Sequence, residues 1–590
     1  YEIRLSLVGS EMCIRDSLIR ELEGVMSHSV LSGPKTPARA IMGTSTATML
    51  RPFATALGSV VRLPFTGDTQ TLRASLASIN GMVEAIPESF TLFRERLNSY
   101  WKGDIATIKT RFSEYSKGDD NWEILRRWAE DSGRASEGEK AAFRMANMAR
   151  SMNDSNFLTY STKLMAATDD AFAYILGRAK MREKAMRRAM DLQDGGYTTP
   201  KITKEVMRAY EDDFYSQVFD AQGNITDEAT KFARKEVTLT QELTGFAKGL
   251  NDAFTSMPLA KPFFLFARTG VNGLALTGKY TPGFNFLVKE FNDIALAKPS
   301  DLTEVAKYGI TDAVELSNAK ALQTGRLAMG SAVTFMAVQA WMRGDLNGNG
   351  PVDRQKRQMW LDGKWEPRTI KLGAVRVGYD TFEPFNLIMS TIADVGDASE
   401  LMGDEWTESE LQKISLVVAQ AVSSKSYLAG IQSFVDLFGG RPGQFDRILA
   451  GLANNQVPLA GLRNELGKLF LPYMREIGSG IDQSIRNRNL INEQFAQLDG
   501  NQPLPIKYDL LNGKPLKDWD FLTRAFNAVS PVSLSLDQSP GRNMLFDSGY
   551  DLRMSTYYAP DSTNLTDAPR AVSYTHLRAH ETKANLVCRL

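Results

Sequence analysis

The most regular alternation of apolar and polar positions in the chain lies at residues 155–192. Apolar side chains recur there at spacings of three, four and seven, which is the period of one face of an α-helix. This apolar face is formed by Met165, Phe172, Leu176, Ala179, Met186 and Met190. A second face carries Lys180, Lys184, Arg187 and Arg188. The pattern predicts a long helix with a packed apolar face and a solvated basic face, and a DNA- or phosphate-binding surface is the sharper alternative.

Weaker helical patterns flank this segment on both sides. Residues 18–100 are expected to form helices interrupted at 32–39 and 63–70, with Thr69 or Thr71 as the N-cap of the helix that follows. Thr226 is expected to cap a later helix. The remaining expected helices span about 206–218, 226–254, 387–402, 408–423, 425–438 and 443–495. Because the helical period dominates, we expect a mainly α fold, an elongated assembly of many helices.

Two apolar segments interrupt the amphipathic pattern. Within residues 257–276, the run Phe263–Phe266 is apolar on every side and is expected to be buried in a core or to face a partner. Residues 327–342 are the most apolar stretch of the chain. The second segment has sixteen residues, fewer than the roughly 20 that a helix needs to span a bilayer. A core helix is therefore expected there, and membrane insertion or an interfacial helix is the alternative. The side chains proposed for interaction with partners or a membrane are Phe263, Phe264, Phe266, Leu327, Phe335, Trp341 and Met342.

A change to strand-like alternation occurs at residues 369–379. Two short runs flank Gly373-Ala374, and Gly at the first turn position suits a two-residue type II′ turn. The sequence therefore predicts one small β-hairpin within the helical chain. After Gln502 the composition turns irregular, and an extended tail is expected. The expected divisions are 18–150 (N-terminal helices), 151–256 (long helix), 257–400 (apolar helices and hairpin), 401–500 (C-terminal helices) and 501–571 (tail).

The two ends of the chain have a common explanation. Residues 11–17, EMCIRDS, are encoded in one frame by the mosaic end of a transposase-based sequencing adapter. The opposite strand of the same DNA encodes VSYTHL at residues 572–577. We therefore expect residues 1–17 and 572–590 to be translated adapter, and the biological part to be a fragment of a longer protein.

Composition changes once these ends are set aside. Both cysteines, Cys13 and Cys588, lie in the adapter segments, as do His576 and His580, so His28 is the remaining histidine. A disulfide framework, a thiol nucleophile, a Cys/His zinc site and a histidine-based triad are excluded for residues 18–571. The whole chain has 69 basic and 69 acidic residues, which argues against a general nucleic-acid binder. No catalytic constellation is evident, so we expect no enzyme activity and no cofactor in this fragment.

Two motifs resemble ligand-binding loops, one for phosphate and one for calcium. Residues 273–279 resemble a phosphate-binding loop, but Tyr280 stands where Ser or Thr should bind Mg²⁺. The segment that begins at Asp345 matches the first half of a calcium loop, although Lys356 stands where a bidentate Glu is needed. An Asn/Gly-rich turn is therefore the expected structure of this second segment. The weak calcium candidates are Asp345, Asn347, Asn349 and Asp353.

Three segments in order carry a resemblance to a known family. They are KLMAATDDAFAYILGRAKMREKA at 163–185, PLAKPFFLFARTGVN at 258–272, and the block 329–397 with its Gly348–Pro351 turn and Trp365–Pro367 hairpin start. This order resembles the C-terminal regions of the large internal virion proteins, or DNA-ejection proteins, of short-tailed bacteriophages. The resemblance covers about 155–480 and departs from the family pattern at Gly270, where the family has Pro.

The resemblance implies a protein that is packaged inside the capsid with the genome and leaves it at infection. It would then help to build a conduit for DNA across the host envelope, in the periplasm and at the inner membrane. Implied partners are further copies of the chain, other internal virion proteins, portal or tail components, the host inner membrane, and DNA through the four basic residues at 180–188. Some family members carry a lytic transglycosylase domain near the N-terminus, which could lie upstream of this fragment. The alternative function is a scaffold domain of a large phage polyvalent protein whose enzymes lie elsewhere.

Overall fold

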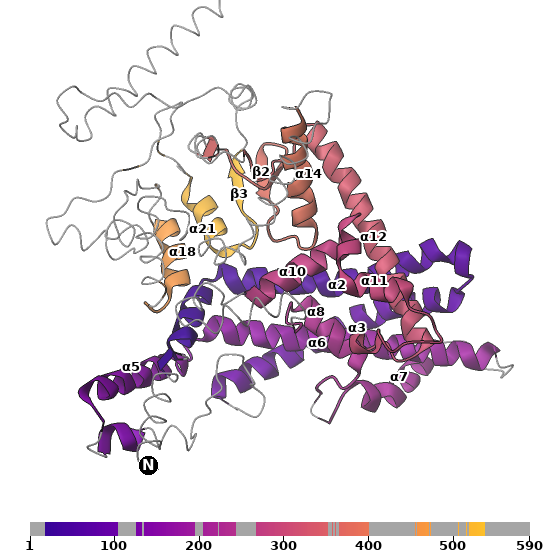
Figure 1. Cartoon of the computed structure of the whole chain (residues 1–590), viewed down its shortest axis with the longest axis horizontal. Helices are drawn as coiled ribbons and strands as arrows, with labels where there is room; N and C mark the ends of the chain where they lie inside the picture. The colour runs from indigo at the N-terminus through magenta and orange to yellow at the C-terminus, as the bar shows by residue number, and fades with distance from the viewer. Residues whose placement is uncertain are drawn as a thin grey trace, which may run out of the picture.

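The structure is a computed structural model. It describes residues 18–103 (except 20), 126–131, 135–194, 204–242 (except 222), 267–351, 365–400, 457–470 and 519–536, and a few isolated residues between these ranges. The described elements are mainly helices with one small antiparallel sheet, so the predicted fold class is confirmed (Figure 1).

Two long helices, α2 (Lys35–Thr66) and α3 (Thr69–Lys102), form an antiparallel hairpin joined by two residues. Gly67 ends α2 in the left-handed conformation at φ 65°, which a residue without a side chain adopts freely. Asp68 then caps α3 by accepting hydrogen bonds from the Thr71 backbone N–H at 2.9 Å and from its hydroxyl at 2.6 Å. The predicted break at 63–70 is therefore confirmed but shorter, and the cap is Asp68 rather than Thr69 or Thr71.

The long helix expected from periodicity is α6 (Tyr160–Asp194), which packs along α3. Met82 and Ala85 of α3 contact Ile175 and Ala179 of α6 in one buried cluster. The helix α7 (Lys204–Val218) lies against α6, and Phe219 fills the space beside Gly177. Two shorter N-terminal elements, α5 (Glu137–Asn153) and the π-helix η1 (Arg127–Asp131), share a cluster around Phe143.

The helix α12 (Ala313–Met342) crosses α2 at close range. A Cβ added at Gly325 would lie 1.7 Å from the Ala54 carbonyl oxygen, and one added at Gly58 would lie 1.8 Å from the Ala321 oxygen. Glycine at both positions is therefore required for the two backbones to approach each other. The apolar segment 327–342 is the C-terminal half of this longer helix rather than a separate element.

Short helices fill the space between these long ones. They are α8 (Glu228–Val237), α10 (Ala267–Tyr280), the 3₁₀ turn η3 (Phe284–Leu287), α11 (Lys289–Leu296) and the 3₁₀ turn η4 (Ala306–Tyr308). Asp227, not the expected Thr226, caps α8 by accepting from the Thr230 backbone N–H at 2.9 Å. The α8 helix ends at Val237, which is earlier than predicted. Glu236, the residue before the last in α8, is buried.

The predicted hairpin is present as β1 (Thr369–Leu372) and β2 (Val375–Gly378), with Leu372 paired to Val375. Gly373 has the positive φ, 67°, that the expected turn requires at its first position. A third strand, β3 (Leu534–Leu536), pairs with β2 and completes the order β1-β2-β3. The helix α14 (Phe385–Glu400) follows the hairpin and packs on α12 and α10.

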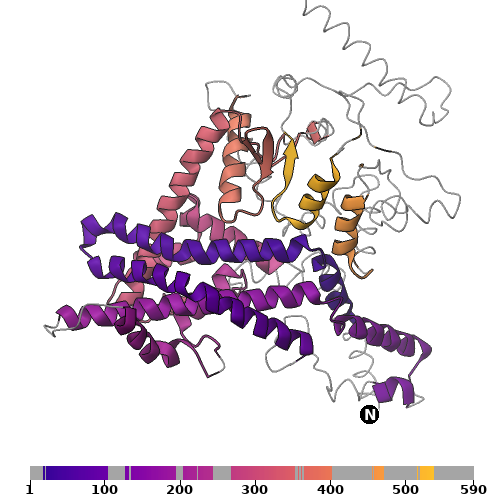
Figure 2. The same cartoon turned by 180° about the vertical axis from the view of Figure 1, so that it is seen from behind.

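The tail predicted to be irregular contains regular structure in its described part. Besides β3, it holds α21 (Phe521–Val529), capped by Asp520 and packed on α18 (Ala460–Phe470). The α18 helix in turn contacts the N-terminal residues, because the Ser29 hydroxyl accepts a hydrogen bond from the Ala460 backbone at 3.0 Å. The helices expected at 408–423 and 425–438 lie outside the described residues. Viewed from behind, the α2–α3 hairpin runs across the near side of the molecule (Figure 2).

Candidate functional site

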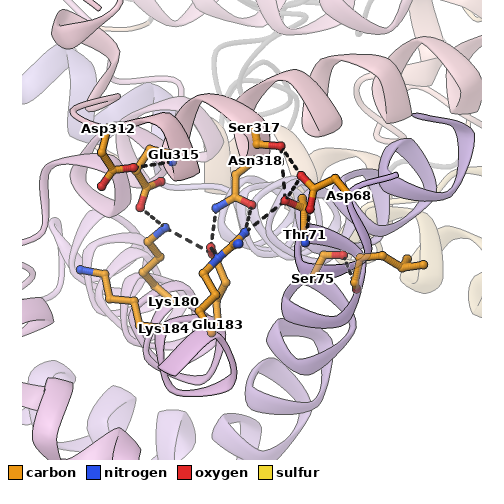
Figure 3. Close-up of polar contacts among 12 residues, drawn as sticks. Asp68, Thr71, Ser75, Lys180, Glu183, Lys184, Asp312, Glu315, Ser317 and Asn318 are labelled. Atoms are coloured by element: carbon orange, nitrogen blue, oxygen red, sulfur yellow. Dashed lines mark hydrogen bonds and ion pairs between the residues drawn. The ribbon is translucent and has the colours of Figure 1, made fainter. Parts of the chain in front are cut away.

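The basic face predicted on α6 is turned toward carboxylates of the same chain. Lys180 lies 2.6 Å from Glu315, Lys184 lies 2.9 Å from Asp227, and Arg188 lies 2.7 Å from Asp213. The side chains of Lys180 and Arg187 are only 10% and 13% exposed. The prediction of a solvated face is therefore wrong for these two residues, which donate hydrogen bonds to Glu315 and Asn318 of α12. Figure 3 shows Lys180 directed toward Glu315. Their charge is compensated within the chain instead of being presented to DNA.

A polar cluster at the start of α12 joins three helices. The Ser317 hydroxyl donates to Asp68 at 2.6 Å, and Arg187 donates to the Asn318 side-chain oxygen at 2.6 Å. Asn318 also donates to Glu183, so α3, α6 and α12 are linked through side chains (Figure 3). Burial would raise the pKa of Asp68, but hydrogen bonds from Ser317 and Thr71 hold that pKa below its usual value. The cluster therefore favours the charged carboxylate.

A second ionic cluster, which we call the Glu236 cluster, lies deeper in the molecule. It consists of Arg51, Glu236, Lys279, Glu290 and Arg326. Lys279 bridges Glu236 at 2.6 Å and Glu290 at 2.5 Å, and Arg326 lies 2.6 Å from Glu236. The five side chains come from α2, α8, α10, α11 and α12. This cluster therefore connects more helices than any single apolar cluster described above.

Three of the five side chains in the Glu236 cluster are almost free of solvent, while Arg51 is 22% exposed. The side chains of Glu236, Lys279 and Arg326 are each 2% exposed. Burial disfavours the Glu236 carboxylate, but Arg326, Lys279 and Arg51 outweigh that effect and hold its pKa well below the usual value. Arg326 also lies over the Tyr280 ring, 5.6 Å from its centroid. A buried charge set of this kind fixes helix positions, because loss of one partner leaves the others uncompensated.

The sequence offered one indirect signal for this cluster. Lys279 is the last residue of the phosphate-loop pattern at 273–279, and Arg326 immediately precedes the apolar segment 327–342. Both residues interrupt apolar helical faces, α10 and α12, at positions that point inward. A charged residue on a buried helical face indicates a buried ion pair, but the partner residues could not be identified from spacing alone.

A cavity of about 120 Å³ separates the two ionic clusters. Arg51, Glu290 and Gln323 line it on one side, and Lys180, Glu183 and Asn318 line it on the other. The hydroxyl oxygen of Thr48 is buried against it and has no hydrogen-bond partner among the described residues. A polar space of this size accommodates several water molecules, which would complete the hydrogen bonding of Thr48.

The calcium candidates do not converge on a common point. Asp345 pairs with Arg343 at 2.9 Å, and the Asn347 side chain donates to the Glu366 carbonyl at 3.0 Å. The Asn349 side chain donates to Asp394 at 2.6 Å. These three candidates therefore serve three different partners, and Asp353 lies outside the described residues. Within the described part of the chain, no group of three or more His, Cys, Asp or Glu side chains could hold a metal ion.

Asp394 is the centre of this turn. Its carboxylate accepts from the Asn349 and Gly350 backbone N–H groups, at 2.5 Å and 3.2 Å, and from the Asn349 side chain. Burial raises the pKa of Asp394 to about 7 despite these hydrogen bonds. The carboxylate thus ties the turn after α12 to α14, as the Asn/Gly-rich turn interpretation expects.

The predicted interaction residues on α12 have mixed environments. Phe335 and Met342 are 66% and 69% exposed, whereas Leu327 and Trp341 are half-buried. Trp341 donates from its ring nitrogen to Asp397 at 2.8 Å and packs against Gly396. Phe263, Phe264 and Phe266 lie outside the described residues. In the part of the chain that the structure describes, no helix combines the length and apolar character needed to cross a membrane.

A larger exposed apolar surface lies on the α2–α3 hairpin, and the sequence analysis did not identify it. Large side chains point outward along both helices: Met49, Phe53, Leu57, Val60, Val61 and Phe65 on α2, and Leu76, Val83 and Phe90 on α3. The sequence signal that could have revealed this surface is the alternation of small and large apolar residues along α2. Small residues such as Ala54 and Gly58 face inward, while Met49, Phe53 and Val60 lie on the other side of the helix; Val61 and Phe65 follow Gly58 at spacings of three and seven and lie on its side.

Comparison of the chain with protein-family models, with curated proteins and with solved structures finds no match. The arguments for function therefore depend on the geometry of these sites and on the resemblance in sequence. Two features stand out: ionic clusters enclosed within the helical body and large apolar side chains on its surface.

Proposed function

We propose that this chain is part of an internal virion protein of a tailed bacteriophage, packaged with the genome and ejected at infection. In this role it helps to build the conduit through which DNA crosses the host envelope. Its partners are further copies of itself, other internal virion proteins, and portal or tail components. Its place is the capsid interior first, and the host periplasm and inner membrane afterwards.

The distribution of apolar and charged side chains is the observation that carries this proposal. Exposed apolar residues follow α2, α3 and the end of α12, and such surfaces on a folded protein mark contacts with partners. The charges that could attract DNA, at Lys180, Lys184, Arg187 and Arg188, are already paired with carboxylates or covered. The proposal therefore emphasises assembly with other proteins over DNA binding by these four residues.

The segments that resemble the family also lie within connected structure. The first segment is part of α6, the described end of the second begins α10, and the third contains most of α12, the hairpin and α14. Leu276 and Tyr280 of α10 pack with Met329 of α12 and with Ile388 of α14 in one cluster. The second and third segments therefore belong to helices that pack together, α10 with α12 and α14.

Mass spectrometry of purified phage particles tests the proposal. Tryptic peptides from residues 155–480 should be present in particles at a constant ratio to capsid protein. A replication protein of the same phage serves as the negative control for contamination by lysate. Absence of these peptides from particles in which capsid peptides are abundant would contradict the proposal. Genes for portal and tail proteins next to this gene would favour it over the polyvalent scaffold alternative.

Contact with the inner membrane is tested separately by flotation of the full chain with anionic liposomes. The exposed side chains Phe335 and Met342 should contribute, so the double variant Phe335→Ser/Met342→Ser should float less than the unchanged chain. Equal flotation of both proteins, or flotation of neither, would remove the membrane from the proposed partners.

A further inference from the structure

The beginning of α2 lies in a junction of three helices. Lys35, the first residue of α2, donates to the Asn527 carbonyl oxygen of α21 at 3.3 Å. The charges of Glu465 and Lys468, both on α18, also act on Lys35. Because α21 packs on α18, the three helices meet around this one lysine (Figure 1).

A second cation of α2 lies at the same junction. Arg39 follows Lys35 by one turn, so both side chains lie on one face of the helix. The Arg39 Nε atom is buried, and no hydrogen bond or ion pair joins this guanidinium group to any residue that the structure describes. Burial removes water from a guanidinium group, and that cost is offset only when another acceptor replaces the water. Arg39 therefore lacks the acceptor that its position requires.

The carboxylates whose charges act on Lys35 are already paired with other cations. Glu465 lies 2.8 Å from Lys468, and Asp380 lies 2.8 Å from Arg368. The two cations at the beginning of α2 thus have no carboxylate of their own among the described residues. They form a surplus of positive charge in a partly buried place.

The electrostatic environment of Lys35 agrees with this surplus. Burial, and after it the charge of Arg39, lowers the pKa of Lys35 to about 8, although the two carboxylates act in the opposite direction. The first turn of α2 has no acidic residue, and no side chain caps its N-terminus. The first backbone N–H groups of α2 therefore add to the positive potential at the junction. An anion there would be stabilised by both side chains and by the helix.

We infer that Lys35 and Arg39, with the more exposed Lys468 as a third cation, bind a phosphate group. Inorganic phosphate or a phosphate monoester carries a charge of about −1.5 to −2 at pH 7, which matches two cations, whereas a carboxylate would compensate one. Arginine and lysine together supply donors to several oxygens of such an anion. Free phosphate and the backbone of DNA share this chemistry. The inference does not rest on the proposed function, because it concerns the purified chain.

Isothermal titration calorimetry of the full chain with inorganic phosphate, at an ionic strength held constant with chloride, tests the inference. One phosphate should bind per chain, and Arg39→Met should weaken binding by about tenfold or more, through loss of charge-assisted hydrogen bonds. Without phosphate, Arg39→Met should have the same Tm as the unchanged chain or a higher one, since an unpartnered buried group is removed.

Two further variants complete this experiment. Lys468→Gln, at a side chain 58% exposed, should weaken phosphate binding by about threefold and serves if Arg39→Met fails to fold. Arg73→Gln, at an exposed arginine of α3, is the matched control and should leave phosphate binding unchanged.

Fluorescence anisotropy with a short labelled DNA duplex, at the same ionic strength, distinguishes the two sources of phosphate. DNA binding that Arg39→Met weakens and Arg73→Gln does not would assign the site to the DNA backbone. Binding of inorganic phosphate without DNA binding would assign it to free phosphate or a monoester. Absence of both, or equal phosphate binding by Arg39→Met and the unchanged chain, would overturn the inference. Equal loss in Arg73→Gln would also overturn it, because general charge attraction would then explain the binding.

Discussion

The two halves of α12 differ in a way that their sequences do not suggest. The first half, from Ala313 to Arg326, carries charged residues and is largely buried, with Arg326 only 2% exposed. The second half, residues 327–342, is the most apolar stretch of the chain and still leaves Phe335 and Met336 66% and 58% exposed. The more apolar half of this helix is therefore the more exposed half.

The difference shows that the neighbours of a segment decide its burial. The first half crosses α2 and lies over α6, whose Lys180 and Arg187 donate hydrogen bonds to Glu315 and Asn318 of α12. The second half packs on α10 and α14 along one side only, through Gly330, Ala337 and Ala340. Its small residues face the neighbours and its large residues face outward. An apolar helix half in this position is suited to a partner that the described part of the chain does not supply.

The largest expected effect is at Glu236, the carboxylate that compensates Arg326 in the buried first half of α12. Glu236→Gln should lower the free energy of unfolding by about 3–5 kcal/mol, because Arg51, Lys279 and Arg326 would remain buried around a neutral group. Urea denaturation followed by circular dichroism measures the change. The control is Glu95→Gln on the exposed side of α3, which should change stability by less than about 0.5 kcal/mol. Similar losses in both variants would show that the cluster does not stabilise the first half of α12.

An intermediate effect on the free energy of unfolding is expected at Asp394, which anchors the turn that follows the exposed second half of α12. Its pKa is raised to about 7 by burial, so the folded state binds a proton that the unfolded state releases near pH 4. The free energy of unfolding should therefore fall as pH rises from about 4 to 7, by at most about 1.4 kcal/mol per pH unit. Asp394→Asn cannot titrate and should lose less stability over that window. Parallel stability curves for the two proteins, from denaturation at four pH values, would contradict the raised pKa.

The smallest effect on the free energy of unfolding is expected from substitutions in the exposed second half of α12. Phe335→Ser removes an aromatic ring but should change the free energy of unfolding by no more than about 0.5 kcal/mol, since the ring is 66% exposed. Ala337→Val, two residues away and 3% exposed, should cost about 1–3 kcal/mol because added methyl groups would press on α14. Thermal unfolding of both variants gives the comparison. If Phe335→Ser proved the more damaging, the second half of α12 would have to be covered within the chain.

Local patterns predicted the elements well. The periodic run at 155–192 became α6, and the alternation around Gly373 became the β1–β2 hairpin, because both are determined by neighbours within a few residues. Caps were predicted within one to three positions: Asp68 and Asp227 cap their helices where Thr was expected. A carboxylate next to a Thr offers the same type of acceptor, so the sequence alone does not decide between them.

Features that depend on distant partners were not predictable in the same way. The basic side of α6 looks solvated in sequence, and it is buried because Glu315 and Asn318 arrive from a helix more than a hundred residues later. Pairing of β3 with β2 depends likewise on residues far apart, which is why the tail was expected to be irregular. The Glu236 cluster needs five helices to meet, and no spacing rule within one helix describes such a meeting.

The contact between the N-terminal residues and α18 also sets a time order for folding. Ser29 and Ala460 are 431 residues apart, and Ser32 and Leu462 are 430 apart, whereas α2 and α3 are joined by two residues. At a synthesis rate of about 5–20 residues per second, Ser29 waits on the order of 20–90 seconds for its partner to be made. The hairpin can form within that interval.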